Sequence, residues 1–171
     1  MAKSRLYWDT SIFLCFLNRD EQERSKICED VLQHAAMDEV LILTSTYTIV
    51  EVIRPKKRSL PASQPLTTPQ IEKIKGMFRW PFIQTIELDD RVALYASDLA
   101  RDYGLAPADA VHAASAILWK AESLQAWDRD FTAISHVTPV EQPQFISKQL
   151  RIEGTERSRI GPSPDDFEAP K

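Results

Sequence analysis

The sequence predicts an α/β protein, a three-layer α/β/α sandwich built around a central, mainly parallel sheet. Short apolar runs with strand composition alternate with helical segments several times along the chain, an order that is typical of a parallel sheet with helices on both faces. The run Val40–Leu43 is continuously apolar, as expected for a strand buried on both faces. A length of 171 residues allows one such domain, which we place at residues 1–142, and a short extension over residues 143–171.

The first strand and the two helices after it are indicated by apolar runs and a capping residue. Leu6–Trp8 is short and apolar and ends at Asp9, a residue type that often caps a helix. A helix is therefore expected over Ile12–Leu17. A longer helix is expected over about Glu21–Met37, because its apolar residues fall on one face.

A second strand and helix follow at Val40–Leu43. Ser45 is a suitable N-cap for a helix over Thr46–Ile53. Pro55 ends that helix, because proline has no backbone N–H for the hydrogen-bond ladder. Residues 55–68 contain three prolines and a basic cluster, a composition that is typical of an exposed loop.

The remaining elements are indicated by helix-starting aspartate and proline, by a helix-ending glycine and by further apolar runs. Helices are expected at Pro69–Phe78, from Asp89 to Gly104 and from Pro107 to about Trp119, strands at Ile83–Ile86 and Ser123–Ala126, and a last apolar stretch at Ile134–Val140. After residue 142 the chain becomes polar and rich in proline, glutamate and serine, so we expect the extension to be partly disordered, above all over residues 161–171.

The composition excludes several classes of protein. With 43% hydrophobic and 27% charged residues, the chain has the balance of a globular protein. No apolar run approaches the roughly 20 residues that cross a bilayer, and charge appears too early for a signal peptide, so we expect a cytoplasmic protein with no membrane segment. A net charge of −4, from 21 basic and 25 acidic residues, argues against a protein that simply coats nucleic acid. Cys15 and Cys28 are too few and too close together for a disulfide framework or a zinc site, and we expect both to be buried as small hydrophobic residues.

Four acidic residues stand at the junctions of these elements, and each could have a purely structural role. Asp9 and Asp128 could cap helices, and Asp109 lies in the first turn of its predicted helix, where negative charge favours the helix dipole. Glu51 differs, because it has apolar residues on both sides, and a buried carboxylate needs a metal ion or another cation nearby. Arg54, three positions on, is a candidate for that cation.

Taken together, the four acids favour a metal site. Asp9 and Asp128 follow strands, Glu51 lies in the helix after a strand, and Asp109 opens another helix of the wound sheet. Ligands of open parallel sheets bind beyond the carboxyl ends of the strands. Carboxylates gathered there repel one another unless a cation lies between them, and oxygen ligands select Mg²⁺ or Mn²⁺. Such a site can activate water for attack on a phosphodiester.

Four short motifs around these acids resemble those of a known family. They are Tyr7-Trp-Asp9-Thr-Ser, Thr48-Ile-Val-Glu51-Val, Leu105-Ala-Pro-Ala-Asp109-Ala-Val-His-Ala-Ala114 and Ala126-Trp-Asp128-Arg-Asp130-Phe131. In content and order, over roughly residues 5–140, they resemble the four acidic motifs of PIN-domain nucleases. The resemblance is closest to the VapC-like toxins of prokaryotic toxin–antitoxin pairs, and the third motif is the most specific.

The resemblance implies a PIN-like nuclease domain over residues 1–142. It implies that Asp9, Glu51, Asp109 and Asp128 bind one or two Mg²⁺ or Mn²⁺ ions and that the protein is an endoribonuclease acting on single-stranded RNA. It also implies a homodimer and a small antitoxin protein that fills the active-site groove.

The fourth motif departs from the family pattern. Family members often have Thr-Asn-Asp where this chain has Ala126-Trp127-Asp128, so a hydroxyl and an amide are missing. This leaves open a second hypothesis, a catalytically weak PIN-like module that binds RNA or a protein without cutting. A phosphatase or phosphotransfer receiver lacks support, because no second acid neighbours Asp9 and no lysine occupies a matching strand end.

Further polar residues are candidates for supporting roles near the acids. Thr10, Ser11 and Asp130 could assist the metal site, although a helix cap or a turn explains each of them equally well. His112 lies one turn after Asp109 in an apolar helix, and there a packed, hydrogen-bonded histidine is favoured over a general base.

A basic cluster and an aromatic group are candidates for RNA contacts. The basic cluster consists of Arg54, Lys56, Lys57 and Arg58. It could bind RNA phosphates or be an ordinary solvated loop. The aromatic group consists of Phe78, Trp80 and Phe82. These rings could stack on unpaired bases, but packing in the core or in a dimer is favoured.

Overall fold

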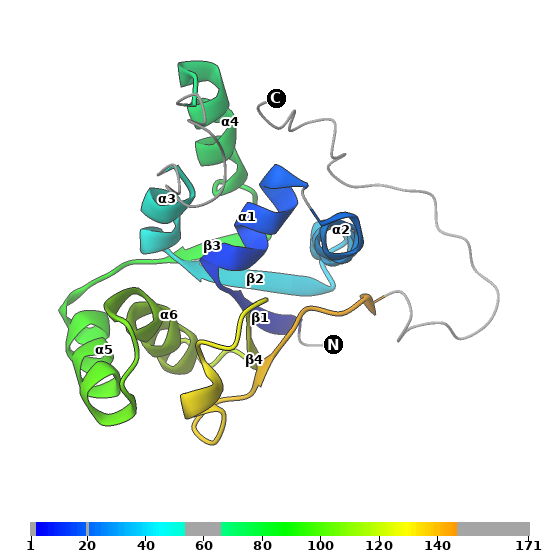
Figure 1. The fold of residues 1–171 in the computed structure, drawn as a ribbon. Helices are drawn as coiled ribbons and strands as arrows, with labels where there is room; N and C mark the ends of the chain where they lie inside the picture. Colours follow the sequence, from blue (N-terminus) through cyan, green and yellow to red (C-terminus); the bar gives the residue numbers. More distant parts are fainter. Residues whose placement is uncertain (1–2, 20, 54–65, 147–171) are drawn as a thin grey trace.

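The strands in the described part of the chain form one fully parallel sheet. In the computed structural model, which describes residues 3–19, 21–53 and 66–146, the strand order is β3-β2-β1-β4-β5 (Figure 1). The strands are β1 Ser4–Trp8, β2 Val40–Ser45, β3 Ile83–Ile86, β4 Ser123–Gln125 and β5 Val140–Glu141. The chain moves outward from β1 to β3 and then returns to place β4 and β5 on the other side of β1. A topological switch point therefore lies between β1 and β4.

Helices cover both faces of this sheet. Those in the described residues are α1 Thr10–Asn18, α2 Gln22–Ala36, α3 Thr46–Ile53, α4 Thr68–Met77, α5 Asp90–Tyr103 and α6 Pro107–Leu118, with a short 3-10 helix, η1, at Thr132–Ile134. Helices α1 to α4 lie on one face and α5 and α6 on the other (Figure 1), which confirms the predicted α/β sandwich. None of these helices is long and apolar enough to cross a membrane. The elements agree with the predicted ones to within about two residues at most ends.

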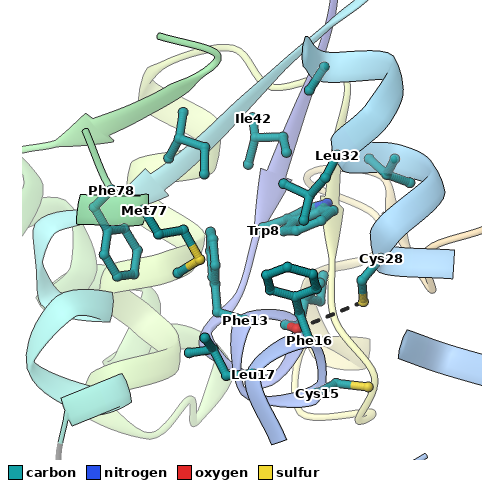
Figure 2. Close-up of a cluster of buried hydrophobic side chains, with 14 of the residues drawn as sticks. Trp8, Phe13, Cys15, Phe16, Leu17, Cys28, Leu32, Ile42, Met77 and Phe78 are labelled. Carbon is teal, nitrogen blue, oxygen red and sulfur yellow. Dashed lines mark hydrogen bonds between the residues drawn. The ribbon is translucent and has the colours of Figure 1, made fainter. Parts of the chain in front are cut away.

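The side chains of β1 point alternately into two separate cores. Leu6 and Trp8 face α1 to α4, whereas Tyr7 faces α5 and α6. On the first face, the Phe13 ring lies 5.4 Å from the Trp8 ring and 5.1 Å from the Phe78 ring, measured between centroids. Figure 2 shows Trp8 and Phe13 near the centre of the first core and Phe78 at its left side. Because β1 is packed on both sides, the position of the residue that follows it is tightly fixed.

The second core depends on small side chains of α6. Ala110, Ala113 and Ala114 are buried against the sheet and α5, and alanine lets a helix backbone approach its neighbours closely. Gly104 ends α5 in the left-handed region with φ 67°, which glycine adopts without steric cost. The chain then turns, and α6 begins at Pro107. Because α6 directly precedes β4, a strand parallel to β1, the helix ends at the amino edge of the sheet and begins at its carboxyl edge.

Two cysteines and three aromatic rings for which the sequence predicts burial or packing lie in the first core. Cys15 and Cys28 are buried, and neither of them forms a disulfide. Phe78 is buried, and Trp80 and Phe82 are partly buried against the same core. The predicted packing of these aromatic rings in the core is therefore confirmed.

The described chain continues a few residues past residue 142. Ile146 packs against the first core, and its backbone N–H donates to the Asp30 carboxylate at 2.7 Å. The part of the extension that is predicted to be disordered, residues 161–171, lies outside the described residues.

Candidate functional site

The four predicted acids belong to segments that meet at the carboxyl edge of the sheet. Asp9 directly follows β1, and Asp128 comes shortly after β4, the strand next to β1. Glu51 lies on α3, which directly follows β2, and Asp109 lies in the first turn of α6. This edge, beside the switch point, is where open parallel sheets bind ligands.

Asp9 is oriented by the start of α1. It is the N-cap of that helix, and its Oδ2 accepts a hydrogen bond from the Ser11 backbone N–H at 3.0 Å. Its own N–H donates to the Gln125 carbonyl at 3.0 Å, which ties it to β4. Its second oxygen, Oδ1, lies 3.5 Å from His112 Nε2. Asp9 therefore caps α1, as the sequence allows, and it also lies in a polar cluster with His112.

Glu51 is held by a hydroxyl and an imidazole. Thr10 Oγ1 donates to Glu51 Oε2 at 2.5 Å, and His112 Nε2 lies 2.9 Å from the same oxygen. The Glu51 side chain is 27% exposed, and its neighbour Val50 is 61% exposed. Glu51 is therefore only partly buried, whereas its apolar neighbours in the sequence predict a buried carboxylate, because α3 leaves one face in solvent.

His112 lies at the centre of this cluster and is only 1% exposed. The Tyr7 hydroxyl lies 2.9 Å from His112 Nδ1, and Thr10 Oγ1 lies 3.2 Å from Nε2. Burial alone lowers the pKa of His112, but the hydrogen bond with Glu51 and the charges of Asp9 and Glu51 outweigh it, so the pKa is raised above its ordinary value. The prediction of a packed, hydrogen-bonded histidine is confirmed, and two of the predicted site acids, Glu51 and Asp9, are among its neighbours.

Asp109 stands among other negative charges. Burial, the largest cause, and the charges of Asp130, Asp9 and Asp128 together raise the pKa of Asp109 to about 6. Asp130 is therefore close enough to Asp109 to influence it, although Asp130 itself is exposed. A cation bound near Asp109 would stabilise the ionised carboxylate and so lower its pKa.

The segment that carries Asp128 is anchored through Trp127. The Trp127 backbone N–H donates to Ser11 Oγ at 3.2 Å, which joins the start of α1 to the loop after β4. The Trp127 ring packs in the first core, 4.9 Å from the Arg24 guanidinium. The tryptophan of the fourth motif therefore has a packing role. Asp128 is exposed, and its Oδ1 lies 3.5 Å from the Asp130 N–H, as in a turn.

The chemistry of these donors suits a hard divalent cation. All four predicted ligands are carboxylates, and oxygen donors favour Mg²⁺ or Mn²⁺ over zinc. Burial and, after it, neighbouring negative charges raise the pKa of Asp109, and a bound cation would favour its ionised form. Within the described residues, no three His, Cys, Asp or Glu side chains are already arranged to hold an ion. In the present arrangement, Glu51 is hydrogen-bonded to Thr10 and His112.

The sequence pattern does not single out Thr10 and His112 as partners of Glu51. Thr10 contacts Glu51 directly, whereas Ser11 binds the backbone of Trp127. A usable signal for His112 is its spacing, since it lies three residues after Asp109 and so on the same face of α6. A buried histidine among alanines also needs polar partners from elsewhere in the chain.

The basic cluster predicted to contact RNA lies outside the described residues. This applies to Arg54, Lys56, Lys57 and Arg58. It applies equally to the ion pair considered between Arg54 and Glu51.

Comparison with known proteins gives one family and several similar folds. A family profile described as PIN domain matches residues 6–137. The fold is similar to a chain of VapBC2 from Rickettsia felis bound to a DNA fragment from the promoter, with a TM-score of 0.55 and 17% identity over 81% of this chain and 98% of that chain. No curated protein sequence matches this chain significantly.

Two further solved structures have similar folds. A chain of a toxin–antitoxin complex from Klebsiella pneumoniae has a TM-score of 0.54 and 18% identity over 82% of this chain and 99% of that chain. VapC20 from Mycobacterium tuberculosis, described as a sarcin-ricin loop cleaving toxin, has a TM-score of 0.57 and 14% identity over 75% of this chain and 93% of that chain. At these identities the likeness establishes the fold alone.

Proposed function

Because the chain belongs to the PIN-domain family, we propose that it is a Mg²⁺- or Mn²⁺-dependent endoribonuclease that hydrolyses phosphodiester bonds of single-stranded RNA. The observation that carries this proposal is the approach of Asp9 and Glu51 to one nitrogen of His112, beside an Asp109 whose pKa is raised by burial and by further acids. Such a group of carboxylates repels a phosphate unless a cation is bound. The proposed metal ligands are Asp9, Glu51, Asp109 and Asp128.

The chain's own residues would hold and orient these ligands. Asp9 Oδ2 is engaged by the Ser11 N–H, and its Oδ1 lies on the side of His112. Glu51 is restrained by Thr10 and His112. When bound, a divalent cation supplies charge neutralisation at the scissile phosphate and lowers the pKa of the attacking water.

The similar structures support a toxin-type role with a protein partner. One of them is described as VapBC2 and another as a toxin–antitoxin complex. We propose that a small antitoxin protein binds this chain and, from the family resemblance, that the chain forms a homodimer. An RNA substrate supports a cytoplasmic location for this activity.

The direct test is cleavage of a fluorescent single-stranded RNA by the full chain, with Mg²⁺ or Mn²⁺ and with EDTA. We expect cleavage that needs the metal and is lost in Asp9→Asn and Asp109→Asn. Asp38→Asn is the matched control, since Asp38 is an exposed acid just before β2, at the opposite edge of the sheet. Full activity in the Asp9→Asn/Asp109→Asn double variant would contradict the proposed nuclease.

A second candidate is a PIN-like module that binds RNA or a protein without cutting. Two observations favour it, namely that no three ligand side chains are already arranged for an ion among the described residues and that Trp127 occupies the fourth motif. This candidate predicts no Mn²⁺ binding by calorimetry and an RNA affinity that persists in EDTA. Mn²⁺ binding together with metal-dependent cleavage would exclude it.

A further inference from the structure

We propose that His112 is a positioning residue, fixed by Tyr7, that holds the Glu51 carboxylate in place for cation binding. This inference rests on the proposed function. His112 is not one of the four proposed ligands, but its Nε2 lies beside two of them, Glu51 and Asp9.

The surroundings of the imidazole determine which nitrogen carries the hydrogen. Nε2 is faced by three oxygens, Glu51 Oε2 at 2.9 Å, Thr10 Oγ1 at 3.2 Å and Asp9 Oδ1 at 3.5 Å. Oxygen acceptors on this side require an N–H, so Nε2 donates. In the neutral ring Nδ1 is then an acceptor, and the Tyr7 hydroxyl donates to it at 2.9 Å.

The ring has little freedom to leave this arrangement. Tyr7 is fully buried on β1, and His112 is 1% exposed on α6. The Tyr7 and His112 rings meet edge to face, with centroids 5.9 Å apart. The hydrogen bond from the buried Tyr7 hydroxyl on β1 therefore fixes the direction in which Nε2–H points.

Glu51 needs such a fixed partner more than Asp9 does. Asp9 is oriented by its own helix start, whereas Glu51 has a long side chain that is 27% exposed on α3. The Nε2–H of His112 and the hydroxyl of Thr10 converge on the same Glu51 oxygen. Removing a hydrogen bond that orients a ligating carboxylate typically weakens metal affinity or activity about 10- to 100-fold.

The test compares two amides of different length at position 112. His112→Gln places an amide N–H near the position of Nε2, whereas His112→Asn is too short to reach Glu51. Mn²⁺ binding to the full chain is measured by calorimetry without RNA, and RNA cleavage is then measured across Mn²⁺ concentrations. We expect His112→Asn to bind Mn²⁺ about 10- to 100-fold more weakly and His112→Gln to recover most of that loss. We also expect the RNA KM at saturating Mn²⁺ to stay near its original value.

A second buried histidine provides the matched control. His34 on α2 is 8% exposed, and its Nδ1 lies 2.5 Å from Glu39 Oε2, just before β2 and thus at the opposite edge of the sheet. His34→Gln disturbs a comparable histidine–glutamate contact there. We expect it to lower the thermal midpoint without changing Mn²⁺ affinity.

Tyr7→Phe keeps the test decisive if His112→Asn does not fold. It removes one hydroxyl, leaves the ring packing intact and is expected to weaken Mn²⁺ binding in the same direction by a smaller factor. Unchanged Mn²⁺ affinity in folded His112→Asn, or in Tyr7→Phe if the former is unfolded, would overturn the role of His112. Original protein that neither binds Mn²⁺ nor cleaves RNA would instead overturn the proposed function, and with it this inference.

Discussion

Glu51 and His112 are 61 positions apart in the sequence, yet Glu51 Oε2 lies 2.9 Å from His112 Nε2. The contact joins α3 to α6 at the carboxyl edge of the sheet. It places a hydrogen-bond donor beside two acids, Glu51 and Asp9. The negative charge of these carboxylates is therefore offset by hydrogen-bond donors such as His112 and Thr10.

Substitutions of Asp9 should separate its charge from its role as a helix cap. Asparagine can still accept a hydrogen bond from the Ser11 N–H, so Asp9→Asn should keep the stability of α1 while RNA cleavage falls below detection. Asp9→Ala should lose cleavage and also about 1 kcal/mol of the free energy of unfolding. Urea unfolding and RNA cleavage on both variants check this, and equal stability of the two would contradict the capping role.

Asp109 should impose a pH-dependent cost on the metal-free fold. Its pKa is about 6 in the folded protein against an ordinary value of 3.8, so the folded state binds this proton more tightly. This tighter proton binding stabilises the folded state. The stabilisation is fully present below about pH 4 and is lost as the pH rises through about 6. In EDTA, Asp109→Asn should therefore become progressively more stable than the original protein between about pH 4 and pH 7. A stability difference that does not change with pH, measured by urea unfolding, would argue against a raised pKa.

Divalent cations should stabilise the folded protein against urea. A ligand that binds only the folded state at about 100 times its Kd adds about 2.7 kcal/mol to the free energy of unfolding. We expect such a gain with Mn²⁺, its loss in Asp9→Asn, and a smaller loss in Asp128→Asn, because Asp128 is exposed on a loop. An equal gain in the original protein and in Asp9→Asn would show that Mn²⁺ binds elsewhere.

The predicted basic cluster should appear in the salt dependence of RNA binding. Each phosphate contact to a single strand adds about 0.7 to the slope of log affinity against log salt. The triple variant Lys56→Ala/Lys57→Ala/Arg58→Ala should reduce this slope by up to about 2. Lys120→Ala is the control, because Lys120 is an exposed residue just after the far end of α6. An unchanged slope in the triple variant would show that Lys56, Lys57 and Arg58 do not contact RNA phosphates.

The close approach of α6 to the sheet should make Ala113 intolerant of larger side chains. Ala113 is fully buried in the second core, and overpacking of a close-packed site costs about 1–3 kcal/mol. Ala113→Leu should therefore lower the free energy of unfolding by that amount in urea. Ala93→Leu, on the exposed side of α5, should stay within about 0.5 kcal/mol.

Much of the fold could be predicted from local patterns. The apolar run at Val40 to Leu43, the cap residues Asp9 and Asp89 and the stop at Gly104 each act over a few neighbouring residues, and the structure contains all of them. The alternation of strands and helices then leaves few ways to wind a parallel sheet. For the same reason the sequence directs the segments that carry the four acids to one edge of that sheet.

What the sequence alone determined is therefore the α/β architecture and the set of acids at its carboxyl edge, because periodicity, caps and connection rules depend on nearby residues. Only the tertiary structure decided that Glu51 is partly exposed, that Thr10 and His112 bind it, and that Trp127 packs under Arg24. These contacts join α1, α3, α6 and the loop after β4. They depend on side-chain directions between elements far apart in the chain, which no local pattern specifies.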